Sequence, residues 1–135
     1  MPKFIVKKLM RDNLDPDVTF ENLRSLTHDE FTIALKEKLL EEGQELIEAS
    51  SKEEQIDELA DIYEILETLQ KELSISELDI QIKKNKKKSW RGGFEKRYYA
   101  DAVFIPEDHR LLPHCRSQPD KYPEKHSEVS KKNDS

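Results

Sequence analysis

The chain has 135 residues, a single-domain length, of which 39% are charged and 35% hydrophobic. With a mean hydropathy of −0.88, the core of a monomer would be thin, because small domains bury a smaller share of their surface. We therefore expect a homo-oligomer, a dimer or a tetramer. The net charge of −6 combines an acidic middle, 41–79, with a basic segment from Lys83 to Arg97. A nucleic-acid-binding protein is usually basic throughout, so no nucleic acid partner is expected.

Signals for membranes and secretion are absent from the sequence. It contains no apolar run that could span a membrane and no signal peptide. Cys115 is the single cysteine, so an internal disulfide is excluded and a reducing compartment is favoured. We expect a cytoplasmic protein without a membrane partner.

The N-terminal segment, Met1 to Leu14, mixes apolar and basic residues. Either a short strand or a helical turn fits this pattern, and the sequence does not choose between them. Asp15-Pro16-Asp17 predicts a turn at its end. Phe20 and Leu23 are expected to pack on the core.

Three capping boxes predict the starts of three helices. In a capping box, a hydroxyl residue at the N-cap is followed three positions later by a Glu. The three pairs are Thr27 with Glu30, Ser51 with Glu54, and Ser74 with Glu77. The helices are expected over about 28–49, 52–73 and 75–88. The short link between the first two makes them antiparallel neighbours, so we predict an all-α fold, an antiparallel helical bundle.

The region after the third helix changes character. The glycines of Arg91-Gly92-Gly93-Phe94 are expected to break the helix. Residues 98–105 are rich in aromatic and β-branched side chains, which favours a last strand-like segment. Residues 106–135 lack an apolar period and read as a polar, disordered or loosely attached tail. The predicted domain is therefore 1–105.

Four carboxylates are predicted to face the seam between the first two helices. They are Glu42 and Glu45 on the first helix and Glu58 and Asp61 on the second. Each helical residue advances by about 100°, so residues seven apart share a face. Glu42 follows the apolar Leu35 by seven positions, and Glu58 precedes Ile65 by seven. The other two acids flank them on an arc that still faces the core.

The position of these acids indicates a metal site. Burying like charges costs on the order of several kcal/mol per ion unless something compensates. A hard divalent cation compensates directly, and Mg²⁺ prefers carboxylate oxygens. We therefore predict that the four acids bind Mg²⁺, with Mn²⁺ as an alternative. The other interpretation is a solvated acidic face on two Glu-rich helices.

Four segments carry a resemblance to a known family. Lys38-Leu39-Leu40-Glu41-Glu42-Gly43-Gln44-Glu45-Leu46, followed by Glu58-Leu59-Ala60-Asp61, resembles the Glu-Glu-x-x-Glu…Glu-x-x-Asp signature of MazG-like nucleotide pyrophosphohydrolases. Lys8-Leu9-Met10-Arg11-Asp12 and Arg91-Gly92-Gly93-Phe94-Glu95-Lys96-Arg97 are similar to segments of the phosphoribosyl-ATP pyrophosphohydrolase-like subgroup. The resemblance covers roughly 3–105, with Asn13 standing where that subgroup has a lysine.

The resemblance implies a MazG-type helical bundle, usually oligomeric, that hydrolyses a nucleoside triphosphate to the monophosphate and pyrophosphate with Mg²⁺. It implies the metal ligands Glu42, Glu45, Glu58 and Asp61. Glu41 is the candidate catalytic residue for the attacking water, with a solvated side chain as the alternative. The substrate is a possibly noncanonical NTP or dNTP, which would be a house-cleaning role, or a phosphoribosyl-ATP-like compound.

Candidate substrate-binding residues are Lys8, Arg11, Lys38, Arg91, Lys96 and Arg97. Guanidinium groups bind phosphate bidentately, which favours the two arginines of the basic segment. The two N-terminal cations have a second interpretation, ion pairing with the acidic site. The five lysines within 83–88 also fit a solvated helix end, which suits the helix macrodipole.

Two other functions fit the same sequence. One is a non-catalytic nucleotide-binding module of the same fold, and the other is a helical interaction module whose basic segment binds an acidic protein or RNA. Aromatic residues beside the basic segment either stack on a base or pack in a core or an interface. The four histidines lack metal-ligand spacing and receive no role.

Overall fold

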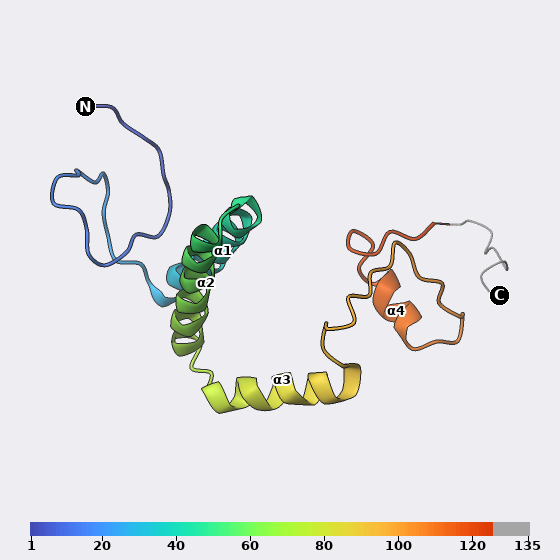
Figure 1. The fold of residues 1–135 in the computed structure, drawn as a ribbon. Coiled ribbons are helices and arrows are strands. Elements are labelled where there is room, and N and C mark those ends of the chain that lie inside the picture. The colour runs from blue at the N-terminus through green and yellow to red at the C-terminus, as the bar shows by residue number, and fades with distance from the viewer. Residues whose placement is uncertain (126–135) are drawn as a thin grey trace. The chain divides into compact units, whose positions relative to one another are not determined.

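The computed structural model describes residues 1–125, and every regular element in that range is a helix (Figure 1). The helices are α1 (His28–Glu48), α2 (Lys52–Glu72), α3 (Glu77–Arg91) and α4 (Leu111–Arg116). The predicted all-α class is confirmed. The chain divides into two compact units, Met1–Gly92 and Gly93–Ser135. Residues 126–135 of the predicted tail lie outside the described residues, and the predicted domain boundary after 105 stays a prediction.

The first two helices begin where their caps were predicted. The Thr27 hydroxyl accepts a hydrogen bond from the Glu30 N–H (3.3 Å), and the Glu30 carboxylate accepts one from the Thr27 N–H (3.1 Å). Ser51 caps α2 by accepting from the Glu54 N–H at 3.1 Å. The Glu54 carboxylate accepts from the preceding N–H, that of Ser50, at 3.4 Å. Both starts follow from local hydrogen bonds that satisfy N–H groups left unpaired at a helix N-terminus.

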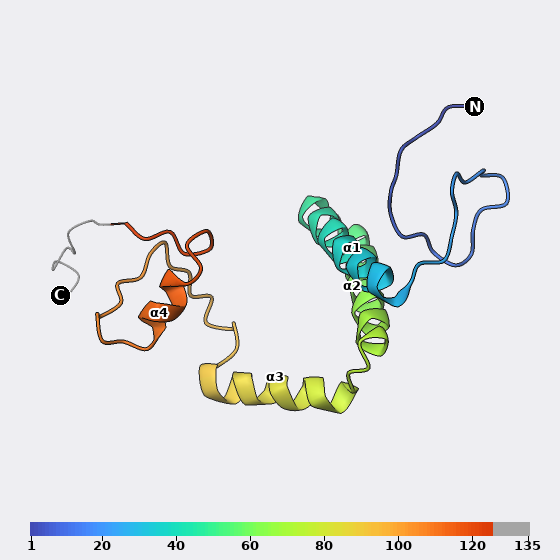
Figure 2. The ribbon, with the colours of Figure 1, turned by 180° about the vertical axis from the view of Figure 1, so that it is seen from behind.

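Helices α1 and α2 pack side by side as an antiparallel hairpin, as both views show (Figures 1 and 2). Leu35 and Ile65 form its buried centre, with 3% and 6% of their surfaces exposed. His28 at the start of α1 contacts Glu72 at the end of α2, with Nδ1 2.6 Å from Oε1. This contact ties the open end of the hairpin and gives that histidine a structural role the sequence did not predict. Among residues 1–125, no helix has the length and apolar content needed to cross a membrane.

The predicted start of the third helix is wrong by two residues. Ser74 is not its N-cap but adopts a left-handed conformation, with φ 56°. Its N–H donates to the Lys71 carbonyl and the Ile75 N–H to the Gln70 carbonyl, both at 3.0 Å. This pattern is a Schellman motif, which ends α2. Ser76 caps α3 instead, because the hydroxyl–acid spacing occurs twice here and the turn ending α2 has already used the first serine.

The segments outside the hairpin contain fewer elements than predicted. Residues 98–105 form no strand, and residues 1–14 form neither a strand nor a helical turn. A strand needs a neighbouring strand to pair its backbone N–H and C=O groups, and residues 1–125 contain none. The predicted break after α3 is confirmed, with Gly92 at φ 81°. Helix α4 lies in a segment for which no element was predicted.

The left-handed serine gives a test of the second turn. Ser74→Gly is expected to raise the free energy of unfolding by about 1 kcal/mol, because glycine adopts positive φ without a steric penalty. Urea denaturation measures this change. Ser76→Ala is the matched variant, and it should lower helical content measured by circular dichroism because it removes the cap of α3. Destabilisation by Ser74→Gly would contradict the assignment.

Candidate metal centre

The seam between α1 and α2 brings acidic side chains together. Glu42 is buried, with 4% of its surface exposed, and Glu58 and Asp61 on α2 are half-buried. One carboxylate oxygen from each of these three residues lies within 4.8 Å of the others. Glu41, Glu42 and Glu45 form a second group with the same spacing. Glu42 belongs to both groups, so the predicted acids and Glu41 gather around one buried carboxylate.

Glu45 is exposed, unlike the other three acids, although its hydrogen bonds with Glu42 and Glu58 keep its carboxylate at the predicted seam. Its position flanks the seam, and two helices enclose too narrow an arc to cover it. Its carboxylate still lies beside that of Glu42. Whether any of the acids binds a metal stays a prediction.

Two carboxylate oxygens at the seam have no donor among the described residues. They are Glu42 Oε2 and Glu58 Oε2, and both are buried. Two ionised carboxylates cannot hydrogen-bond each other, because neither has a proton to donate. Buried acceptors without a donor are rare in folded proteins and call for a proton or a cation. The oxygen-only set of side chains therefore fits a hard divalent ion such as Mg²⁺.

The pKa values of the three glutamates indicate whether the cluster favours a proton. The hydrogen bond with Glu42, followed by burial, raises the pKa of Glu58 to about 8. Burial acts to raise the pKa of Glu42, but hydrogen bonds with Glu58 and Glu45 and the charge of Lys38 outweigh it and lower that pKa. The pKa of Glu45 is raised, chiefly by its hydrogen bond with Glu42. In the absence of a cation, the raised pKa of Glu58 therefore favours a proton on the Glu42–Glu58 pair at neutral pH.

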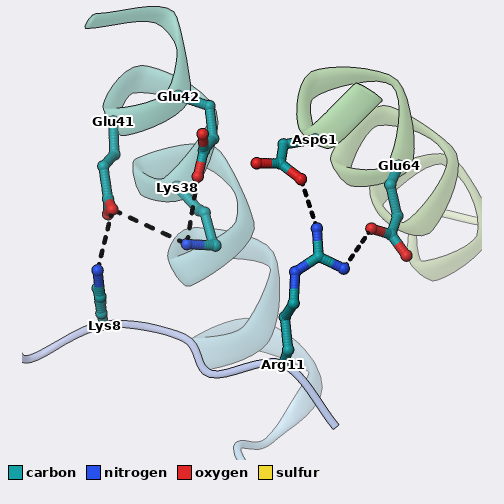
Figure 3. Close-up of polar contacts among 7 residues, drawn as sticks. All are labelled: Lys8, Arg11, Lys38, Glu41, Glu42, Asp61 and Glu64. Carbon is teal, nitrogen blue, oxygen red and sulfur yellow. Dashed lines mark hydrogen bonds and ion pairs between the residues drawn. The ribbon is translucent and has the colours of Figure 1, made fainter. Parts of the chain in front are cut away.

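Two lysines lie on the α1 side of the cluster (Figure 3). Lys8 Nζ is 3.2 Å from Glu41 Oε1. Lys38 Nζ is 3.9 Å from the same oxygen and 3.5 Å from Glu42 Oε1, and its side chain is only 18% exposed. Both residues were predicted to bind substrate. The structure places them where they neutralise the acids, which is the second interpretation given to Lys8.

Arg11 makes the corresponding contacts on the α2 side (Figure 3). One guanidinium nitrogen pairs with Asp61 Oδ1 and the other lies 2.7 Å from Glu64 Oε1. Glu64 was not among the predicted site residues. It follows Asp61 by three positions, so the repeat Glu58-x-x-Asp61-x-x-Glu64 was the signal that could have identified it.

The remaining predicted phosphate ligands belong to other parts of the chain. Arg91 is the last residue of α3, and Lys96 and Arg97 lie in the second unit. Lys96 Nζ is 5.8 Å from the centroid of the Tyr98 ring. A phosphate-binding role for these three residues stays a prediction.

The fold and the acid cluster define an α-helical protein with a carboxylate site suited to a divalent cation. The sequence model described as phosphoribosyl-ATP pyrophosphohydrolase matches residues 6–84, more than half of the chain. The chain therefore belongs to this family of pyrophosphohydrolases, which lies within the MazG-like superfamily. Members of the family generally depend on a divalent metal. Comparisons with curated proteins and with solved structures give no match.

The family match covers the site described above. It begins in the N-terminal segment and runs through α1 and α2 into α3, so it includes the acids and the three cations that contact them. It ends before Arg91, and the resemblance of residues 91–97 lies outside it. The predicted family is confirmed.

The raised pKa of Glu58 predicts a pH dependence in metal-free protein. Between its ordinary value of 4.5 and about 8, the folded state holds a proton that the unfolded state has released. The free energy of unfolding should therefore fall as pH rises through this window. The lowered pKa of Glu42 acts below the window. Urea denaturation with EDTA at several pH values measures the slope.

Glu58→Gln should flatten this slope, because glutamine does not titrate. Glu67→Gln, the same substitution at an exposed position of α2, serves as the control and should keep the wild-type slope. Equal slopes in the wild type and Glu58→Gln would show that Glu58 does not hold the proton.

Proposed function

We propose that the protein is a Mg²⁺-dependent nucleoside triphosphate pyrophosphohydrolase. The substrate would be a canonical or noncanonical NTP or dNTP, or a phosphoribosyl-ATP-like compound, and the products the monophosphate and pyrophosphate. The observation that carries this proposal is the pair of buried oxygens without donors, Glu42 Oε2 and Glu58 Oε2. In a chain that belongs to a pyrophosphohydrolase family, such a pair is best explained by a cation that it binds during function.

The two carboxylate groups suggest how ions would be held. Glu42, Glu58 and Asp61 would hold one ion, and Glu45, whose carboxylate lies beside that of Glu42, would offer a further oxygen ligand. A bound divalent ion neutralises charge on phosphate oxygens and lowers the pKa of a coordinated water. Hard oxygen ligands favour Mg²⁺, and Mn²⁺ accepts the same set.

The other side chains would orient the reactants. Glu41 is the proposed base that accepts the proton of the attacking water, and the two lysines beside it hold its carboxylate in place. Lys8, Lys38 and Arg11 place three positive charges at the seam where a triphosphate would lie. Phosphoryl chemistry depends mainly on such positioning and charge stabilisation. Arg91, Lys96 and Arg97 are proposed to contribute further phosphate contacts.

A second copy of the chain is proposed to cover the outer faces of the hairpin. On α1, Ile33, Leu40 and Ile47 recur every seven residues and are 57%, 77% and 78% exposed. On α2, the exposed apolar residues are Ile56, Leu59, Tyr63 and Leu66. Spacings of three, four and seven residues are typical of helices that pack against other helices. Two hairpins joined along these faces would form a four-helix bundle of the MazG type.

The activity is tested with purified protein, Mg²⁺ and a panel of nucleotides, assayed for pyrophosphate. Glu58→Gln and Asp61→Asn should each lower the rate by about 100-fold or more, since even changes behind a metal ligand cost 10- to 100-fold. Glu67→Gln is the matched control and should retain wild-type activity. Undiminished activity in both site variants would contradict the proposed mechanism. Tight nucleotide binding without pyrophosphate release would favour the non-catalytic module.

The oligomer is tested by analytical ultracentrifugation. The wild type should sediment as a dimer or a tetramer, and Tyr63→Glu should shift it toward monomer because a charge is buried in the proposed interface. Phe4→Glu, at a side chain 81% exposed outside both faces, should leave the assembly unchanged. A monomeric wild type at micromolar concentration would contradict the proposal.

A further inference from the structure

Two cations of one N-terminal segment contact both helices of the hairpin. Lys8 contacts Glu41 on α1, and Arg11, three residues later, contacts Asp61 and Glu64 on α2 (Figure 3). The segment therefore crosses the mouth of the acidic seam. Both contacts involve acids of the candidate centre, because Glu41 belongs to one group of carboxylates and Asp61 to the other.

We propose that Arg11 is an exchangeable counter-ion of the site. It neutralises Asp61 while no divalent ion is bound, and it transfers to the phosphates of the nucleotide when an ion takes that carboxylate. This inference rests on the proposed function, because it needs both the metal centre and an anionic phosphate substrate. It assigns the N-terminal segment a part in regulating access to the site.

Arg11 and a divalent ion would compete for the carboxylate of Asp61. The guanidinium of Arg11 occupies Oδ1, and a carboxylate oxygen held in this hydrogen bond is a poor ligand for a dication that repels the same guanidinium. An ion bound to Asp61 weakens this hydrogen bond by repelling the guanidinium, which then favours another acceptor. A phosphate with two oxygens in the plane of the guanidinium supplies one.

Glu64 lets this exchange occur without losing Arg11 from the site. It accepts from the other guanidinium nitrogen at 2.7 Å, and it belongs to neither carboxylate group of the candidate centre. It can therefore keep its contact while Asp61 changes partner. Glu64 is a positioning residue for the arginine in this scheme.

The N-terminal segment is held weakly enough to adjust. Residues 1–27 contain no helix or strand, and between the two cations Leu9 and Met10 are only half-buried. The preceding Phe4 and Ile5 are 81% and 70% exposed. The Arg11 side chain itself is 63% exposed, and exposed ion pairs contribute little to stability. A divalent ion can displace such a contact.

The first test is Mg²⁺ binding by calorimetry without nucleotide. Arg11→Ala should bind the ion about 2- to 5-fold more tightly than the wild type. The ion no longer competes with Arg11 for Asp61, and the free energy of an exposed ion pair corresponds to a change in affinity of about this size. Lys3→Ala removes a cation of the same segment that pairs with Glu21 instead, and its affinity should equal that of the wild type. With Mg²⁺ and a non-hydrolysable triphosphate analogue, Arg11→Ala should bind the nucleotide more weakly.

A second measurement separates exchange from a general effect of charge. The side-chain Nε–H signal of Arg11 in ¹⁵N NMR spectra, assigned by its loss in Arg11→Lys, should shift when Mg²⁺ is added and again when the analogue is added. In Glu64→Gln, the signal should sharpen on Mg²⁺ addition, because the released side chain becomes mobile.

The outcomes distinguish the two proposals. Failure of the wild type to bind any divalent ion would overturn the metal centre and the exchange together. Normal Mg²⁺ binding and pyrophosphate release, with equal Mg²⁺ affinities in the wild type and Arg11→Ala or an Arg11 signal that Mg²⁺ does not shift, would overturn the exchange alone.

Discussion

The hairpin depends on how it accommodates two carboxylates in its seam, those of the buried Glu42 and the half-buried Glu58. The seven-residue spacing that aligns them with Leu35 and Ile65 also packs the helices together. The contacts that build the core thus bring the acids into contact. Because an unpaired carboxylate in such a place is destabilising, the hairpin needs a proton, a basic side chain or a cation to compensate.

The structure provides basic side chains, its pKa values favour a proton, and its carboxylate oxygens suit a cation. The raised pKa of Glu58, about 8, favours a proton on the Glu42–Glu58 pair, and the basic side chains are Lys8, Lys38 and Arg11. The pKa of Glu58 lies close to the physiological pH range, and the exposed ion pairs of Lys8 and Arg11 contribute only about 0–1 kcal/mol each. Lys38 is the more shielded cation, since it lies beside the buried Glu42 with its side chain 18% exposed. A dication, which interacts with several carboxylates at once, would compete effectively with such partners. Membership of a pyrophosphohydrolase family gives that property a chemical use.

Local spacing explains what the sequence could predict. The caps at Thr27 and Ser51 and the burial of Glu42 depend on residues within seven positions of one another, and all three are confirmed. The errors arise where two local solutions compete or where distant partners decide. Ser74 satisfied the capping pattern, but its backbone was already used to end α2, and residues 98–105 had β propensity without a strand to pair with. The contact of Arg11 with Glu64 joins residues 53 positions apart. The helical period relates only nearby residues, so it could not predict this contact.

The exposed apolar faces of the hairpin bear on the strength of the site as well as on assembly. On α2, the stripe from Ile56 to Leu66 lies roughly 120° around the helix from Glu58, so it adjoins the acidic seam without covering it. A second hairpin packed on that stripe, as proposed above, would turn the seam into an inner layer of a larger bundle. Excluding water from its flanks would lower the local dielectric, which raises the cost of an uncompensated carboxylate and strengthens its attraction for a cation. Assembly and metal binding would then reinforce each other. Assembly would strengthen the attraction of the carboxylates for a cation, and the bound cation would remove the cost of enclosing uncompensated carboxylates. A chain with only two buried apolar side chains among its described residues, Leu35 and Ile65, would gain both stability and metal affinity from that coupling.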